Sequence, residues 1–182
     1  PKWIAADLLS QAEHDPRAAV FLITPDKDFG LAVQKEMEKQ MKELSRYEIM
    51  KSSVDQYAKA FLCKDAEQCF DIVNKIAPEH LEVELPDPKK YLPLIYNAGA
   101  IFLGKYTSEP IGDYMAGPNH TLPTSGTAAF SSPLGVYDFV KHSSVECYSE
   151  EAFRKISKKV QLFAKAEGLT AHAHAMEVRD ED

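Results

Sequence analysis

Apolar residues recur at helical spacing in several stretches of the sequence. Residues 3–14 place their apolar side chains on one face of a helix, which ends before Pro16. A second helix is predicted after Pro25, and a third opens at Asp65, where Gln68 completes a capping-box pattern. The apolar positions that define these helices are Ile4, Ala5, Leu8, Leu9, Ala12, Val33, Met37, Met41, Leu44, Phe70, Val73 and Ala77.

Three largely apolar runs have the length of a strand. They cover residues 19–24, 59–63 and 98–103, and such runs are typical of strands buried on both faces of a parallel sheet. Strands that alternate with helices predict an α/β fold, here a partial parallel, Rossmann-like sheet with flanking helices. Ligands of such sheets bind beyond the carboxyl ends of the strands, so we expect a site after the third run.

Residues 104–135 follow that run and show neither a helical nor a strand period. The segment is rich in glycine and proline but also carries aromatic side chains and few charges, which favours an ordered loop over a disordered one. It offers a carboxylate, an amide and an imidazole at Asp113, Asn119 and His120. We therefore expect this loop to contribute to a functional site.

The last part of the chain has a different character. Ser149 is a predicted cap for a helix with a single apolar stripe, and Gly168 separates this helix from a short helical tail. Because one amphipathic helix cannot bury its stripe alone, we expect it to dock on the α/β part or on a partner chain. The sequence thus predicts an α/β domain over residues 1–135 and a helical tail or dimerisation segment over residues 136–182. The stripe consists of Phe153, Ile156, Val160 and Phe163.

Composition narrows the class of protein. A chain of 182 residues with 45% hydrophobic content suits one domain with an appendage. Its net charge of −7 and pI near 5.4 disfavour a nucleic-acid binder, and no apolar run approaches the length of a membrane span. Three cysteines without a CxxC spacing disfavour a disulfide scaffold and a thiolate zinc site, and they fit a reducing cytoplasm.

Several residue pairs could take part in catalysis or metal binding, but each pair alone is weak evidence for such a role. Glu79 and His80 supply two adjacent proton-transfer groups, although such pairs are common on surfaces. Gln11 and His14 are three apart on a helix and can point together, although a histidine at a helix end is more often a solvated cap. His172 and the nearby His174 lack the spacing of a helical metal pair. These residues alone support only a mixed Gln/His/Asp/His site of a kind that zinc accepts.

Five segments taken together resemble the histidinol dehydrogenase family, in the family's order and approximate spacing. They are residues 5–14, 77–82, 97–104, 112–124 and 167–172. The resemblance implies an oxidoreductase of histidine biosynthesis that converts L-histidinol through L-histidinal to L-histidine with zinc and two NAD. The ligands of zinc and substrate that it implies are Gln11, His14, Asp113 and His172. It further implies substrate contacts at His120 and Glu167. The implied acid–base pair is Glu79 and His80.

The resemblance also implies roles for the acid–base pair and for a second subunit. His80 would take the proton in the first oxidation, and Glu79 would activate water for the second. The family is a homodimer in which the carboxyl-terminal segment completes the neighbouring site, so we expect Glu167 and His172 to act in trans. The matching part corresponds to the second half of the family's chain. The part without a counterpart carries most of the cofactor-binding residues for NAD, so we expect this polypeptide to be inactive by itself.

Two other readings stay open at this point. A zinc-dependent hydrolase would use Glu79 as its base and the metal as a Lewis acid, and its activity would not depend on NAD. A non-catalytic α/β dimerisation module would respond specifically to neither zinc nor L-histidinol.

Overall fold

The computed structural model describes residues 1–181 and contains seven α-helices and four strands in that range. The helices are α1 (Lys2–Ala12), α2 (Lys27–Gln40), α3 (Tyr47–Tyr57), α4 (Ala66–Ile76), α5 (Glu109–Tyr114), α6 (Glu150–Ala166) and α7 (Thr170–Asp180). The strands are β1 (Phe21–Thr24), β2 (Lys59–Leu62), β3 (His80–Val83) and β4 (Ala100–Leu103). Short 3₁₀ helices cover Met41–Glu43, Pro88–Leu94, Thr127–Ala129 and Val136–Phe139.

The chain divides into two compact units, Pro1–Phe139 and a second unit that begins at Val140. All four strands lie in the first unit, and α6 and α7 make up the helical part of the second. Within residues 1–181, none of the helices combines the length and the apolar character needed to cross a membrane.

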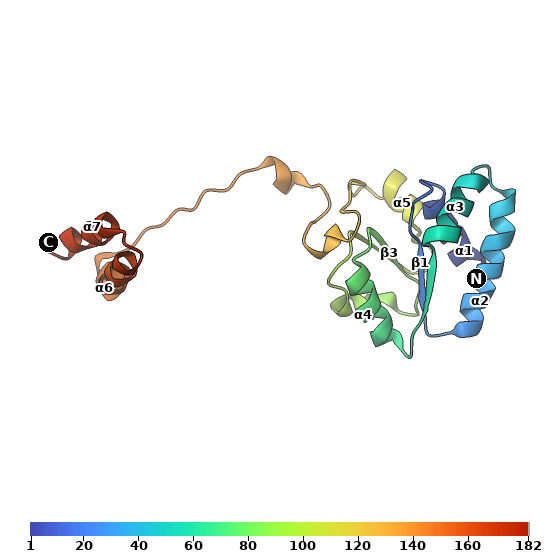
Figure 1. Cartoon of the computed structure of the whole chain (residues 1–182), viewed down its shortest axis with the longest axis horizontal. Helices are drawn as coiled ribbons and strands as arrows, with labels where there is room; N and C mark the ends of the chain where they lie inside the picture. The colour runs from blue at the N-terminus through green and yellow to red at the C-terminus, as the bar shows by residue number, and fades with distance from the viewer. Residues whose placement is uncertain (182) are drawn as a thin grey trace. The chain divides into compact units, whose positions relative to one another are not determined.

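The first unit contains two separate two-stranded parallel sheets. β1 pairs with β2, so that Phe21 lies opposite Lys59, and β3 pairs with β4, so that His80 lies opposite Ala100. Figure 1 shows α1, α2 and α3 grouped on one side of β1 and α4 on the other. This alternation of parallel strands and helices confirms the predicted α/β class with a partial parallel sheet.

Each helical layer has its own apolar core. The core under α1, α2 and α3 contains Ala5, Leu9, Ala12, Val20, Val33, Met37, Met41 and Met50. The core between α4 and β3 contains Phe70, Val73, Leu81 and Val83. Neighbouring residues of β1 serve different cores, because Leu22 packs against the first and Ile23 against the second. β1 therefore lies between the two layers, as its apolar sequence requires.

Helix boundaries follow local sequence signals. The Asp65 side chain accepts a hydrogen bond of 2.8 Å from the Gln68 N–H, while the Gln68 side chain accepts one of 2.7 Å from the Lys64 N–H. This is the predicted capping pattern, with the return bond made to the residue before the cap. Helix α4 ends at Ile76. Its cap residue Ala77 has a left-handed φ of 50°, which turns the chain toward β3.

The structure corrects three parts of the prediction. Residues 104–135 are not a continuous loop, since α5 forms where Pro110 occupies the first helical turn. Strand β3 and helix α3 were not predicted. The runs at 59–63 and 98–103 are not strands buried on both faces, because Leu62 of β2 is 60% exposed and Ile101 of β4 is 39% exposed.

The second unit is a pair of packed helices. The Ser149 side chain caps α6 by accepting a hydrogen bond of 3.2 Å from the Ala152 N–H, as predicted. The residues of α6 that are buried are Ser157, Gln161 and Ala164, rather than the apolar stripe. Ser157 and Gln161 donate hydrogen bonds of 2.8 and 2.7 Å to Asp180 of α7. The contact between the two helices is thus partly polar.

Candidate acid–base and metal site

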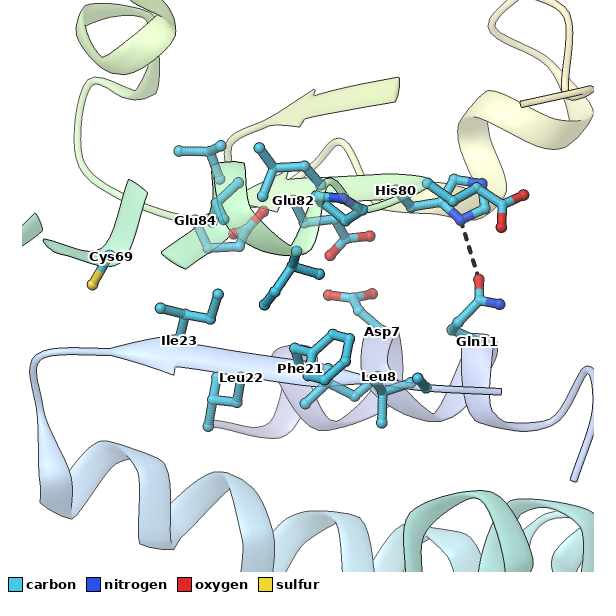
Figure 2. Close-up of a pocket in the computed structure, with 18 of the residues that line it drawn as sticks. Asp7, Leu8, Gln11, Phe21, Leu22, Ile23, Cys69, His80, Glu82 and Glu84 are labelled. Carbon is cyan, nitrogen blue, oxygen red and sulfur yellow. Dashed lines mark hydrogen bonds between the residues drawn. The ribbon is translucent and has the colours of Figure 1, made fainter. Parts of the chain in front are cut away.

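A group of polar side chains gathers where β3 begins. Glu79 and His80 stand at the amino end of this strand, directly after the turn at Ala77. Gln11 lies in the last turn of α1, and its Oε1 atom is 3.1 Å from His80 Nδ1 (Figure 2). The cluster therefore lies at the amino end of β3, and not beyond the carboxyl ends of the strands as the sequence-based argument expected.

The His80 ring is held in one orientation with one nitrogen left without a partner. With Gln11 Oε1 as the acceptor, the neutral His80 ring carries its proton on Nδ1, and this tautomer has a lone pair on Nε2. Among residues 1–181, buried Nε2 finds no hydrogen-bond partner, and Glu109 Oε1 lies 3.8 Å from it. A buried polar atom without a partner is costly, which is typical of an atom that meets a ligand or metal.

Burial and neighbouring charges shift both members of the acid–base pair. Burial lowers the pKa of His80, opposed by the negative charge of Asp113 and assisted by His14. Burial and the charge of Asp113 raise the pKa of Glu79, opposed by His14. These shifts favour a neutral imidazole that can accept a proton, beside a carboxyl group that is more basic than usual.

A second group of acids, which the sequence analysis missed, surrounds this pair. Glu82 Oε1 accepts a hydrogen bond of 2.7 Å from the Glu109 N–H, and its side chain faces Asp7 across the cleft in Figure 2. Burial raises the pKa of Glu109 to about 7, with Asp113 as the next cause. Burial also raises the pKa of Glu82 to about 7, with Asp7 contributing. The first unit therefore concentrates negative charge around His80.

The signal that could have found Glu109 is the start of α5. Ser108 followed by Pro110 is a typical helix opening, and a helix that starts there places Glu109 and Asp113 one turn apart on the same face. His80, Glu109 and Asp113 each offer one ligand atom, and these atoms lie within 4.8 Å of one another. Nitrogen and oxygen donors at such distances can hold a divalent cation of the kind zinc represents.

Two glycines allow the site to close. A Cβ atom on Gly99 would lie 2.6 Å from the Glu79 carbonyl oxygen, and a Cβ on Gly112 would lie 2.6 Å from the ring of Phe102. Because Phe102 is buried in β4, its ring has little freedom to move away. Gly99 thus lets the start of β4 approach Glu79, and Gly112 lets α5 bring Asp113 close to β3.

The structure brings together five of the predicted site residues. Gln11 contacts His80, and His14 and Asp113 are near enough to influence the pKa values of Glu79 and His80. His120 is exposed in the segment after α5. Glu167 and His172 belong to the second unit, where Glu167 is the carboxyl cap of α6, His172 lies in the first turn of α7, and both are exposed.

Comparisons with known proteins agree on one family. A family profile described as histidinol dehydrogenase matches residues 1–180. Histidinol dehydrogenases from Aquifex aeolicus and Listeria monocytogenes serotype 4b are 52% and 53% identical to the chain over all 182 residues. The crystal structure of histidinol dehydrogenase from Elizabethkingia anophelis superposes on the whole chain with a TM-score of 0.89 at 35% identity.

The match covers this chain fully but its relatives only in part. The chain spans 43% of the length of the two curated relatives and 42% of the chain in the crystal structure. The family profile and the structural superposition extend over the strands, α1 and α5, which carry the cluster around His80. The chain belongs to the histidinol dehydrogenase family.

Proposed function

We propose that this chain is part of an enzyme that oxidises L-histidinol through L-histidinal to L-histidine, the last two oxidations of histidine biosynthesis. The observation that carries the proposal is the buried, unpartnered Nε2 of His80, fixed by Gln11 and placed beside Glu79 and Asp113. The chain belongs to a family of dehydrogenases, and Glu79 and His80 are adjacent proton-transfer groups. Both facts support proton abstraction from a substrate hydroxyl.

His80 and Glu79 have separate roles in this proposal. His80 Nε2 accepts the proton of the substrate hydroxyl in the first oxidation, since its neutral form is favoured by burial. Glu79 takes a proton from the water that adds to the aldehyde, which its raised pKa assists. NAD, when bound, accepts the hydrides. We expect the residues that hold NAD to lie mostly in the part of the family's chain that this chain does not match.

Zinc fits the donor atoms around His80. The proposed protein ligands in the first unit are Gln11, His14 and Asp113, of which Asp113 belongs to the group of three potential ligands with His80 and Glu109. Zinc would fix the imidazole and amino nitrogens of the substrate and offset the crowded carboxylates. Gln11, which bonds His80 in the structure, would then orient both the metal and the base.

The remaining proposed site residues are Glu167 and His172 of the second unit and His120 of the first. We propose that Glu167 and His172 complete the site of a second subunit in a homodimer, with His120 as a further substrate contact. The second half of the apolar stripe of α6 supports this arrangement, because α7 covers Ser157 and Gln161 and leaves Val160 37% and Phe163 71% exposed. Neighbouring exposed apolar side chains are typical of a surface that binds another chain.

Zinc binding by the purified chain tests the proposal without requiring NAD. We expect about one zinc per chain, with an affinity that L-histidinol increases and that Asp113→Ala and His172→Ala each reduce at least about tenfold. His142→Ala, outside the proposed site, serves as the control. Zinc binding that is equal in all four proteins, or unaffected by L-histidinol, would contradict the assignment.

A further inference from the structure

Helix α5, which carries Asp113, buries little of its own surface. It has six residues, and the residue that it buries is Glu109, whereas Ile111 and Tyr114 are 42% and 82% exposed. A helix this short is not stable by itself and needs attachment to its surroundings. The position of Asp113 therefore depends on the contacts that hold α5 against β3 and β4.

The first turn of α5 has a backbone donor that the helix does not satisfy. Ser108 occupies the cap position, but within the described part of the chain its side chain makes no capping hydrogen bond. Pro110 has no N–H, and the Ile111 N–H donates a hydrogen bond of 3.1 Å to the Ser108 carbonyl oxygen. The Glu109 N–H remains, and it donates a hydrogen bond of 2.7 Å to Glu82 Oε1. Strand β3 thus supplies a cap to a helix that lacks a side-chain cap of its own.

A second contact fixes α5 on the neighbouring strand. A Cβ atom on Gly112 would lie 2.6 Å from the Phe102 ring, so the backbone of α5 is in direct contact with this ring. Phe102 is the partner of Glu82 in the register of β3 and β4, and its ring centre is 6.0 Å from that of His80. The hydrogen bond and the ring contact therefore attach α5 at neighbouring points of the sheet.

This attachment places the acids of α5 beside His80. One ligand atom from each of His80, Glu109 and Asp113 lies within 4.8 Å of the other two. His80 and Glu82 are two residues apart in β3, so their side chains leave the strand on the same face. Glu109 and Asp113 are four residues apart and share one face of α5. A shift of α5 away from Glu82 would therefore also move Asp113 away from His80.

The surroundings of Glu82 indicate that its acceptor oxygen, and not its charge, is what α5 requires. Asp7 faces Glu82 across the cleft in Figure 2, and the donor of its hydrogen bond is the backbone of another acid, Glu109. A negative charge is unfavourable beside other acids. A neutral side chain of the same shape that keeps the acceptor oxygen should then hold α5 equally well.

We propose that Glu82 is a positioning residue, which caps α5 from β3 and so sets the distance between Asp113 and His80. The inference rests on the proposed function, since Asp113 is a zinc ligand in that proposal. Glu82 is not among the site residues that the family resemblance implies. Residues that orient metal ligands through hydrogen bonds commonly change metal affinity by about ten- to a hundredfold when they are replaced.

The zinc affinities of three variants test this role. Glu82→Leu removes the acceptor, and we expect it to weaken zinc binding about tenfold or more. Glu82→Gln keeps the acceptor and should bind zinc nearly as well as the wild type. Glu84→Leu makes the same change at the acid that follows two residues later, and it should also have little effect. No loss in Glu82→Leu, or an equal loss in Glu82→Gln or in Glu84→Leu, would overturn the proposal.

A measurement without metal separates this role from the proposed function. Nuclear Overhauser contacts between the α-protons of Gly112 and the Phe102 ring report whether α5 lies on β4. We expect these contacts in the wild type and in Glu82→Gln, and we expect them to be weak or lost in Glu82→Leu. Equal contacts in all three proteins would overturn the proposal. If the wild type binds no zinc, the proposed function is contradicted, and these contacts alone decide the role of Glu82.

A local cap distinguishes the formation of α5 from its attachment to β3. Ser108→Asp, added to Glu82→Leu, would cap the helix at the Ile111 N–H without joining it to the strand. We expect this double variant to bind zinc as weakly as Glu82→Leu. Recovery of the wild-type affinity would show that a cap of any origin is sufficient, and it would overturn the assignment of Glu82 as the residue that positions α5.

Discussion

The acids that lie near His80 in the first unit and those that link the helices of the second are in opposite electrostatic situations. In the first unit, burial raises the pKa values of Glu79, Glu82 and Glu109, which lie near one another. In the second unit, hydrogen bonds from Lys165 and Lys158 lower the pKa values of Glu177 and Asp180. The first unit therefore gathers acids around His80 whose pKa values are raised, whereas the second pairs Glu177 and Asp180 with lysines.

This difference indicates what each unit contributes to function. A crowd of carboxylates around a buried imidazole is unfavourable for stability by itself, and a bound divalent cation would offset it. The paired acids of α6 and α7 instead hold two helices together and leave His172 exposed. We interpret the first unit as the larger part of a metal and acid–base site and the second as a scaffold that presents the remaining residues.

The largest expected effect comes from Gly112→Ala in the first unit. The added Cβ would overlap the buried Phe102 ring, so α5 must shift together with Asp113. We expect a loss of about 1–3 kcal/mol in the free energy of unfolding, measured with urea, and weaker zinc binding. Gly30→Ala is the control, because its Cβ would make an ordinary contact of 3.6 Å with Thr24. Equal zinc affinity in both variants would contradict the placement of Asp113 by α5.

A smaller effect, with a defined pH dependence, is expected for Glu82→Gln. The pKa of Glu82 in the folded protein, about 7, is above its ordinary value of 4.5, so ionisation destabilises the fold as pH rises through this range. Glutamine keeps the acceptor for the Glu109 N–H but removes the charge.

The variant should therefore be more stable than the wild type at pH 8, by on the order of 1–2 kcal/mol after allowance for solvent screening, and nearly equal at pH 4.5. Urea unfolding at the two pH values provides the measurement, with the exposed Glu43→Gln as control. A gain of the same size at both pH values would show that the charge of Glu82 is not its cause.

The smallest effect is expected in the second unit, and its pH dependence has the opposite sign. Lys165 Nζ is 2.6 Å from Glu177 Oε1, and this pair lowers the pKa of Glu177. Lys165→Gln should accelerate amide exchange in α7 at pH 7, and the difference should disappear as pH falls through the lowered pKa, because Glu177 is then protonated in both proteins. Lys159→Gln on the same helix is the matched control. A difference that persisted at low pH would rule out the ion pair as its source.

The sequence predicted the elements that have strong local signals. The capping pattern at Asp65 and the cap at Ser149 correspond to observed hydrogen bonds. β3 was missed because its four residues, His80 to Val83, alternate between polar and apolar and follow a helix after only three residues. So short an alternation does not distinguish a strand from a turn.

The acid–base cluster could be predicted only through the family resemblance. Gln11 and His80 are 69 positions apart in the sequence, and their contact depends on α1 and β3 lying across the cleft from each other. Glu109 was missed because its role depends on α5, a six-residue helix inside a segment without a clear period. Local patterns do not report such long-range pairings, which are decided by the packing of the strands.

Mixing two variants that are each deficient in zinc binding tests most directly whether the two units of different chains form one site. In the proposed site, Asp113→Ala would remove a ligand of the first unit and His172→Ala a ligand of the second. If His172 acts in trans, subunit exchange between these variants produces heterodimers with one intact site, so the mixture should bind about one zinc for every four chains. Each variant alone should bind almost none. A mixture that binds no more zinc than its components, while the wild type binds about one per chain, would contradict the account.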